Sequence, residues 1–112
     1  MDLRHDLRLP VECQIQYSGD QIAGKGTLVN LSTGGYGITS EQPLPQGTAL
    51  SLRIYLPDGE TPVEVEVATV RWSRSGRLGL KNVIVKQEEI KRVRHFVASH
   101  AKPADFSFFT KG

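Results

Sequence analysis

Alternating apolar and polar residues predict that most of this chain forms short β-strands. From Val11 to Tyr17, apolar side chains occupy every second position and polar side chains occupy the positions between them. A period of two is typical of a strand with one buried face and one solvent-exposed face. The alternation returns in Ala49–Leu56 and is most regular in Val63–Trp72. The residues of that last strand expected to share one face are Val63, Val65 and Val67.

Three further strands are expected where short apolar runs lie between turn residues. They are Gly26–Leu31, Tyr36–Ser40 and Leu78–Val85. The Asp58-Gly59 pair is a hairpin signal, and Pro43, Pro45 and Gly47 interrupt any hydrogen-bonded ladder in their loop. About six short strands spaced by turns are typical of a small antiparallel barrel. The sequence therefore predicts an all-β fold, a closed or nearly closed small β-barrel.

The end of the chain has a different period and predicts one α-helix. In Gln87–His100, Ile90, Val93 and Val97 recur at helical spacing, with Phe96 beside them. Acidic residues occupy the first turn and basic residues follow, which suits the helix dipole. Residues 101–112 form a short aromatic tail. Packing of this tail on the barrel and packing on a partner both remain open.

Composition restricts the class of protein. The chain has 112 residues, a formal net charge of +2 and one cysteine, Cys13. This length suits one domain, and a single cysteine allows no internal disulfide. The first ten residues lack the apolar segment of a signal peptide, and no apolar run is long enough to span a bilayer. We expect a cytoplasmic protein in which Cys13 packs on the inward face of its strand.

Two short motifs carry the candidate chemistry. The first is RHDLR at Arg4–Arg8, and the second is NLSTGG at Asn30–Gly35. Arginine donates hydrogen bonds in a planar fork and stacks on aromatic faces. Glycine allows close approach to backbone N–H groups, which bind phosphate. Asn30 and Ser32 are alternate residues, so we expect them to share a face and to contact the edge of a nucleobase. The combination suits a phosphorylated purine.

These motifs resemble the paired signatures of the PilZ domain, R-x-x-x-R followed by [D/N]-x-S-x-x-G. The segments VRW, RLGL and EEIKRVRHFV also resemble the last strands and closing helix of that family, so the resemblance runs from Arg4 to about His100. It implies a six-stranded antiparallel barrel with a C-terminal helix. It further implies a non-enzymatic receptor that binds the bacterial second messenger cyclic di-GMP and relays the signal to a partner protein.

The resemblance also assigns residues. It implies that Arg4 and Arg8 hold the guanines and phosphates, and that Asn30, Ser32 and Gly35 form the other wall of the site. Trp72, at a strand end, is an additional candidate for stacking on a purine. The expected organisation is an arginine-bearing arm at 1–10, the barrel with its helix at 11–100 and the tail at 101–112. We expect the arm to fold over the barrel when ligand binds.

Other interpretations remain. The two arginines could be a solvated arm beside a plain hairpin turn, and Trp72 could cap the core. A PilZ-fold interaction module that needs no nucleotide and a small barrel that binds single-stranded nucleic acid are the alternative functions. We expect no cofactor, no metal site and no enzymatic activity, because no nucleophile motif or metal-ligand spacing accompanies His5, His95 and His100.

Overall fold

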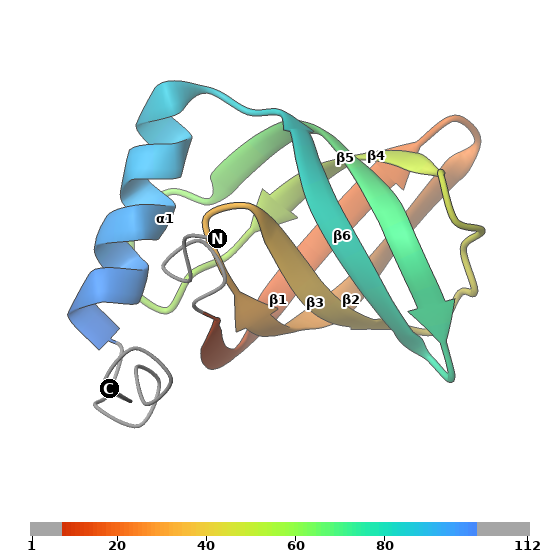
Figure 1. Ribbon diagram of the computed structural model, residues 1–112, viewed down its shortest axis with the longest axis horizontal. Coiled ribbons are helices and arrows are strands. Elements are labelled where there is room, and N and C mark those ends of the chain that lie inside the picture. The colour runs from red at the N-terminus through yellow and green to blue at the C-terminus, as the bar shows by residue number, and fades with distance from the viewer. Residues whose placement is uncertain (1–7, 101–112) are drawn as a thin grey trace, which may run out of the picture.

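The computed structural model, described here for residues 8–100, contains six strands and one helix (Figure 1). The strands are β1 (Leu9–Gly19), β2 (Ile22–Leu31), β3 (Gly35–Ser40), β4 (Ala49–Ile54), β5 (Val63–Arg74) and β6 (Arg77–Ile84). The helix is α1 (Gln87–His100), with the bounds that the sequence predicts. β1 begins at Leu9, so Leu9 and Pro10, assigned from the sequence to the arm, pair with Leu31 and Asn30.

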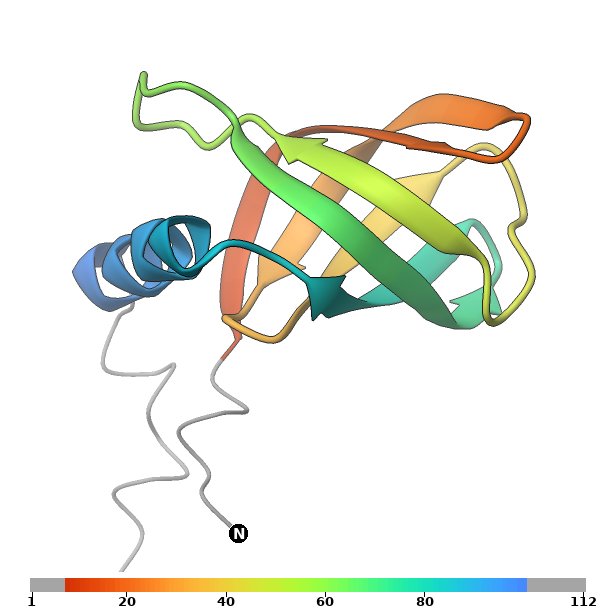
Figure 2. The same cartoon turned by 90° about the horizontal axis from the view of Figure 1, so that it is seen from above.

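The strands form a closed barrel in the order β1-β2-β3-β6-β5-β4, and every neighbouring pair is antiparallel. β1 pairs with β4 and so closes the ring, which places β3 and β6 on the side opposite β4 and β1 (Figures 1 and 2). Bulges interrupt four of the six pairings. Bulges bend and twist strands, which a small closed barrel requires. The predicted six-stranded antiparallel barrel is confirmed.

The alternating side chains build the core of the barrel. Ile15 and Tyr17 of β1 are buried, and so are Val63 and Val65 of β5. Val67, expected on the same face, is only partly buried, because a bulge between Val67 and Ala68 shifts the register and turns Ala68 and Val70 inward. A bulge adds one residue to one strand, and the period-two pattern changes phase there.

Helix α1 lies at the end of the barrel that carries the β2–β3 turn (Figures 1 and 2). Its buried residues are Val93, Phe96 and Val97. Two polar side chains attach it to the start of β5 and to the segment before that strand. Glu89 accepts a hydrogen bond from the backbone N–H of Glu64 at 3.1 Å, and Arg92 donates to the carbonyls of Thr61 and Pro62 at 2.6 and 3.4 Å. Within residues 8–100, no helix is long and apolar enough to cross a membrane.

Replacing Arg92 by alanine is expected to lower the free energy of unfolding by about 1.5–3 kcal/mol, the usual contribution of hydrogen bonds to a charged group. The loss follows because two backbone carbonyls and Glu89 lose their donor. Urea unfolding measures it. Arg94→Ala is the matched control, since Arg94 is exposed on the same helix and should change stability by less than about 0.5 kcal/mol. Equal stability of the two variants would contradict the anchoring role.

Candidate functional site

Four strands bring two of the sequence-predicted residues into one row across the outside of the barrel. Asn30 of β2 lies opposite Gly37 of β3, and Gly37 lies opposite Gly79 of β6. Gly79 in turn lies opposite Trp72 of β5. Asn30 and Trp72, 42 positions apart in the sequence, therefore flank a pair of glycines on adjacent strands.

Both flanking side chains lie over the glycine positions. A Cβ atom added at Gly37 would be 2.5 Å from the amide nitrogen of Asn30, and one added at Gly79 would overlap the indole of Trp72. An aromatic ring that covers a cross-strand glycine is a known device of β-sheets. Trp72 is nevertheless 50% exposed, so the ring rests on the sheet and presents its outer surface to solvent. The indole does not cap the core.

Arg8 reaches the same row from the segment before β1. Its Nη1 donates a hydrogen bond to Oδ1 of Asn30 at 3.0 Å. This bond uses an oxygen of the amide and leaves the guanidinium exposed, with further donors available to a ligand. Residues 1–7, which include Arg4, lie outside the described part of the chain. The expected contribution of Arg4 and the expected closure of the arm therefore remain predictions.

The turn between β2 and β3 is closed by its own serine. Ser32 donates its backbone N–H and its hydroxyl to the carbonyl of Gly35, both at 3.0 Å, and its Oγ accepts the N–H of Gly35 at 3.1 Å. Ser32 is only 4% exposed. The hydroxyl proton and the Gly35 N–H, which the sequence offered as contacts for a ligand, are therefore used within the turn. Ser32 and Gly35 line the site and determine its shape.

The two glycines of the turn differ in their surroundings. A Cβ atom on Gly35 would overlap the backbone carbonyl oxygen of Leu80 in β6, whereas a Cβ atom on Gly34 would meet no atom within 4 Å. Neither residue has the left-handed backbone found at Gly47, Gly59 and Gly76. Glycine is needed at position 35 because β3 and β6 approach closely there, and Gly34 remains exposed at the rim.

These residues surround a hollow of about 570 Å³ on the β3–β6 side of the barrel. Its lining consists of Arg8, Asn30, Ser32, Gly34, Gly35, Tyr36, Gly37, Arg71, Trp72, Gly79, Leu80 and Lys81. Three of them are cations and none is a carboxylate. Burial raises the pKa of Tyr36 to about 12, so this phenol is neutral at physiological pH. The hollow is therefore electropositive and suits an anionic ligand that has flat rings.

Sequence reasoning did not find Arg71, Lys81 and the glycine pair Gly37 and Gly79. Lys81 lies opposite Gly35 in the β3–β6 ladder, and Arg71 lies in the bulge between Val70 and Trp72. Their positions depend on register and bulges, which period-two patterns do not reveal. The available signal was the GYG and RLGL segments, in which a glycine interrupts an otherwise regular strand.

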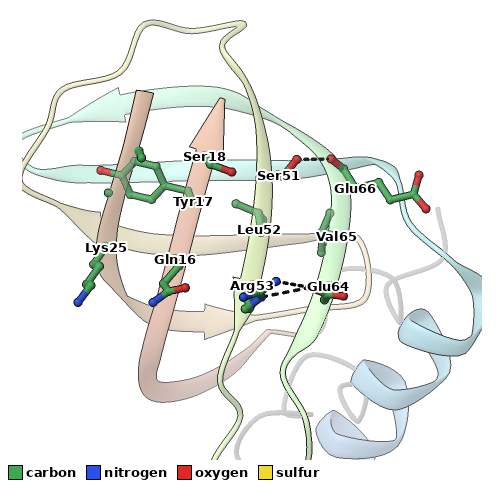
Figure 3. Close-up of a pocket in the computed structure, with 12 residues that line it drawn as sticks. Gln16, Tyr17, Ser18, Lys25, Ser51, Leu52, Arg53, Glu64, Val65 and Glu66 are labelled. Atoms are coloured by element: carbon green, nitrogen blue, oxygen red, sulfur yellow. Dashed lines mark hydrogen bonds and ion pairs between the residues drawn. The ribbon is translucent and has the colours of Figure 1, made fainter. Parts of the chain in front are cut away.

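A second hollow, of about 680 Å³, lies on the opposite side of the barrel over β2, β1, β4 and β5 (Figure 3). A polar row crosses it, in which Arg53 forms a 2.9 Å ion pair with Glu64. Ser51 also donates its hydroxyl to the carbonyl of Glu66 at 2.8 Å. Its charges are balanced within the hollow and it contains neither motif, so the electropositive hollow is the better candidate for a ligand site.

The remaining candidate groups do not join the site. Cys13 is partly buried against the core, and burial raises the pKa of its thiol to about 11. A thiol with this pKa is a weak nucleophile at neutral pH. His100 stacks on Phe96 at the end of α1. Among residues 8–100, no three His, Cys, Asp or Glu side chains gather closely enough to hold a metal ion.

Solved structures of other proteins resemble this chain. The chain resembles the crystal structure of the PilZ domain of CeSA from a cellulose-synthesizing bacterium, with a TM-score of 0.66 and 22% identity over 82% of this chain and 95% of that one. It also resembles the Bacillus subtilis inhibitor of motility, MotI/DgrA, with a TM-score of 0.69 and 18% identity. That match covers 83% of this chain and 48% of the inhibitor, so the chain spans about half its length.

Because their sequence identities to this chain are only 22% and 18%, these two structures show similarity of fold alone. No curated protein sequence is significantly similar to the chain. The profile of the PilZ domain, in contrast, matches residues 2–99, which is nearly the whole chain and includes both arginines of the first motif, the turn of the second and the closing helix. By its sequence and its barrel, the chain belongs to the PilZ domain family.

Proposed function

We propose that this protein is a receptor for cyclic di-GMP, without enzymatic activity, that signals to a partner protein when the nucleotide binds. The observation that carries the proposal is the assembly of Arg8, Asn30 and Trp72 around one electropositive hollow, although they come from distant parts of the sequence. Membership of the PilZ family supports the same ligand. A single half-buried cysteine fits a reducing compartment, so we place the receptor in the cytoplasm.

Each group of the hollow matches a part of this ligand. The exposed face of Trp72 offers a platform for a guanine ring, since an indole stacks well on purines. The guanidinium of Arg8, together with Arg4, can donate in a fork to a phosphate or to the acceptor edge of guanine. Asn30 can hydrogen-bond to a base edge. Lys81 and Arg71 add positive charge at the other rim, beside which we place a phosphate group.

Relay to a partner follows from the position of the site. The ligand bridges the segment before β1 and the outer face of β3, β6 and β5, so its binding changes the surface that this side of the barrel presents. The similar structures come from a cellulose-synthesizing bacterium and from an inhibitor of motility. These settings differ, and we therefore propose a protein partner without naming its pathway.

Binding measurements test the proposal directly. Calorimetric titration with cyclic di-GMP, GTP and cyclic AMP at two salt concentrations should show binding of cyclic di-GMP in preference to the other two. Affinity for single-stranded nucleic acid should be weak, and a steep fall in that affinity with salt would identify the alternative function instead. Failure of cyclic di-GMP to bind at either salt concentration would reject the receptor function.

Trp72 provides a second test, because it is the only tryptophan of the chain. Its emission should change when cyclic di-GMP stacks on the exposed indole. Trp72→Ala should weaken binding by about five- to hundredfold, since stacking of a base on an aromatic ring contributes about 1–3 kcal/mol. Trp72→Phe keeps a ring and should lose less. If the alanine variant binds as tightly as the wild type, the indole is not a ligand platform.

A further inference from the structure

Asn82 of β6 attaches the β2–β3 turn to the barrel at two points. Its backbone N–H donates to the carbonyl of Gly34 at 3.0 Å, and its side-chain Nδ2 donates to the carbonyl of Thr33 at 3.1 Å. Two successive carbonyls of the turn therefore point toward β6. Asn82 and Thr33 are 49 positions apart in the sequence.

This attachment determines where the neighbouring N–H group points. In a trans peptide the C=O and N–H groups point in opposite directions, and the described chain has no cis peptide. The Asn82 side chain holds the Thr33 carbonyl, so the N–H of Gly34 points away from Asn82. Gly34 itself is exposed and lines the hollow. Within residues 8–100 no acceptor is found for this N–H, whereas the next N–H, that of Gly35, is bound to Ser32.

The amide of Asn82 is only partly satisfied by its surroundings. It lies beside the Tyr36 hydroxyl, and this contact partly offsets the rise that burial causes in the pKa of Tyr36. Its Oδ1, however, is buried and has no hydrogen-bond partner in the described part of the chain. A buried acceptor without a partner is unfavourable for folding, and an apolar side chain of similar size would avoid the cost. What the amide provides in return is the orientation of the Thr33–Gly34 peptide.

We propose that Asn82 is a positioning residue of the ligand site: it orients the N–H of Gly34 to donate to a phosphate of the bound nucleotide. The cations at the rim favour an anion at this place, and Lys81, which lies opposite Gly35, is the nearest of them in the ladder. Backbone N–H groups at tight turns commonly bind phosphate oxygens. This inference rests on the proposed binding of cyclic di-GMP.

The experiment combines two variants with one control. Asn82→Ala and Asn82→Leu both remove the side-chain donor and retain the backbone bond to Gly34. Val83→Ala is the control, because Val83 is exposed on the same strand and does not line the hollow. Affinity for cyclic di-GMP is measured by calorimetry, stability by thermal unfolding, and the Gly34 amide by its ¹H–¹⁵N resonance in labelled protein.

In the wild type, addition of cyclic di-GMP should move the Gly34 amide proton downfield. In both Asn82 variants the affinity should fall about five- to thirtyfold, less than the full contribution of a hydrogen bond to a charged group, because the Gly34 N–H is retained and only its orientation is lost. The downfield shift should also be reduced. Asn82→Leu removes the unpartnered Oδ1 together with the donor to Thr33, so it should stay folded at the temperature of the titration. Val83→Ala should bind as the wild type does.

The outcomes separate the two proposals. Binding by the wild type with an unmoved Gly34 resonance, or undiminished affinity in Asn82→Leu, overturns the role of Asn82 and leaves the receptor function intact. A loss of affinity that follows only a loss of folded protein, in both variants, assigns Asn82 to stability alone and also overturns the positioning role. A wild type that does not bind cyclic di-GMP overturns both proposals.

Discussion

Replacing Arg8 by alanine is expected to lower the affinity for cyclic di-GMP about ten- to hundredfold and to leave the fold intact. The loss corresponds to about 1.5–3 kcal/mol, the contribution of a charge-assisted hydrogen bond. The affinity falls because the alanine variant lacks the guanidinium that the ligand is expected to contact. That group is exposed beside Asn30, to whose Oδ1 it donates a hydrogen bond at 3.0 Å. Stability should change by less than about 0.5 kcal/mol, since Arg8 is exposed.

Calorimetric titration of the two proteins measures this effect, and Arg8→Lys identifies its cause. Lysine keeps the charge but has no planar fork. If Arg8 contacts the ligand through two parallel hydrogen bonds, the lysine variant should bind nearly as weakly as the alanine variant. If charge alone matters, Arg8→Lys should recover most of the affinity at low salt and lose it at high salt. Unchanged affinity in Arg8→Ala would remove Arg8 from the site.

The sequence predicts the elements of this fold well because each carries its own periodicity. β1 and β5 show a period of two, and α1 shows helical spacing with acidic residues in its first turn. Changes of phase are less visible in a sequence. Val67 is only partly buried because a bulge follows it, and a bulge is determined by pairing with the next strand and not by the local pattern.

The same physical reason limits prediction of the site. Arg8, Asn30 and Trp72 stand out as residue types, and the structure brings them together. Gly37 and Gly79 appear in the sequence only as glycines that interrupt strands, because their importance comes from the side chains that lie over them from neighbouring strands. Asn82 belongs to this second group, since its role depends on the distance between β6 and a turn far away in the sequence.

Ser32 shows that a motif does not reveal which contacts its side chain makes within the fold. Its spacing from Asn30 indicates a shared face and a hydroxyl that is free to contact a base. Because the chain turns immediately after β2, the hydroxyl instead donates to Gly35 and accepts from the same residue. Ser32 and Gly35 of the NLSTGG segment therefore close the turn, whereas Gly34 remains exposed at the rim of the hollow.

The two glycines of that segment should respond in opposite ways to one added methyl group. Gly35→Ala is expected to lower the free energy of unfolding by about 1–3 kcal/mol, the usual cost of overpacking, because its Cβ would overlap the Leu80 carbonyl and push β3 from β6. Gly34→Ala should be neutral or stabilising by up to about 1 kcal/mol, since its Cβ meets nothing within 4 Å and alanine restricts the unfolded chain.

Urea unfolding of the two variants under one set of conditions measures the difference. Gly35 pairs with Lys81 in the β3–β6 ladder, and the next residue of β6, Asn82, donates its N–H to the carbonyl of Gly34. Separation of β3 from β6 should therefore also move the turn. Gly35→Ala should therefore bind cyclic di-GMP more weakly even under conditions where it is fully folded, whereas Gly34→Ala keeps its N–H and its turn. Equal stability of the two variants would show that close approach of β3 and β6 does not explain the glycine at position 35.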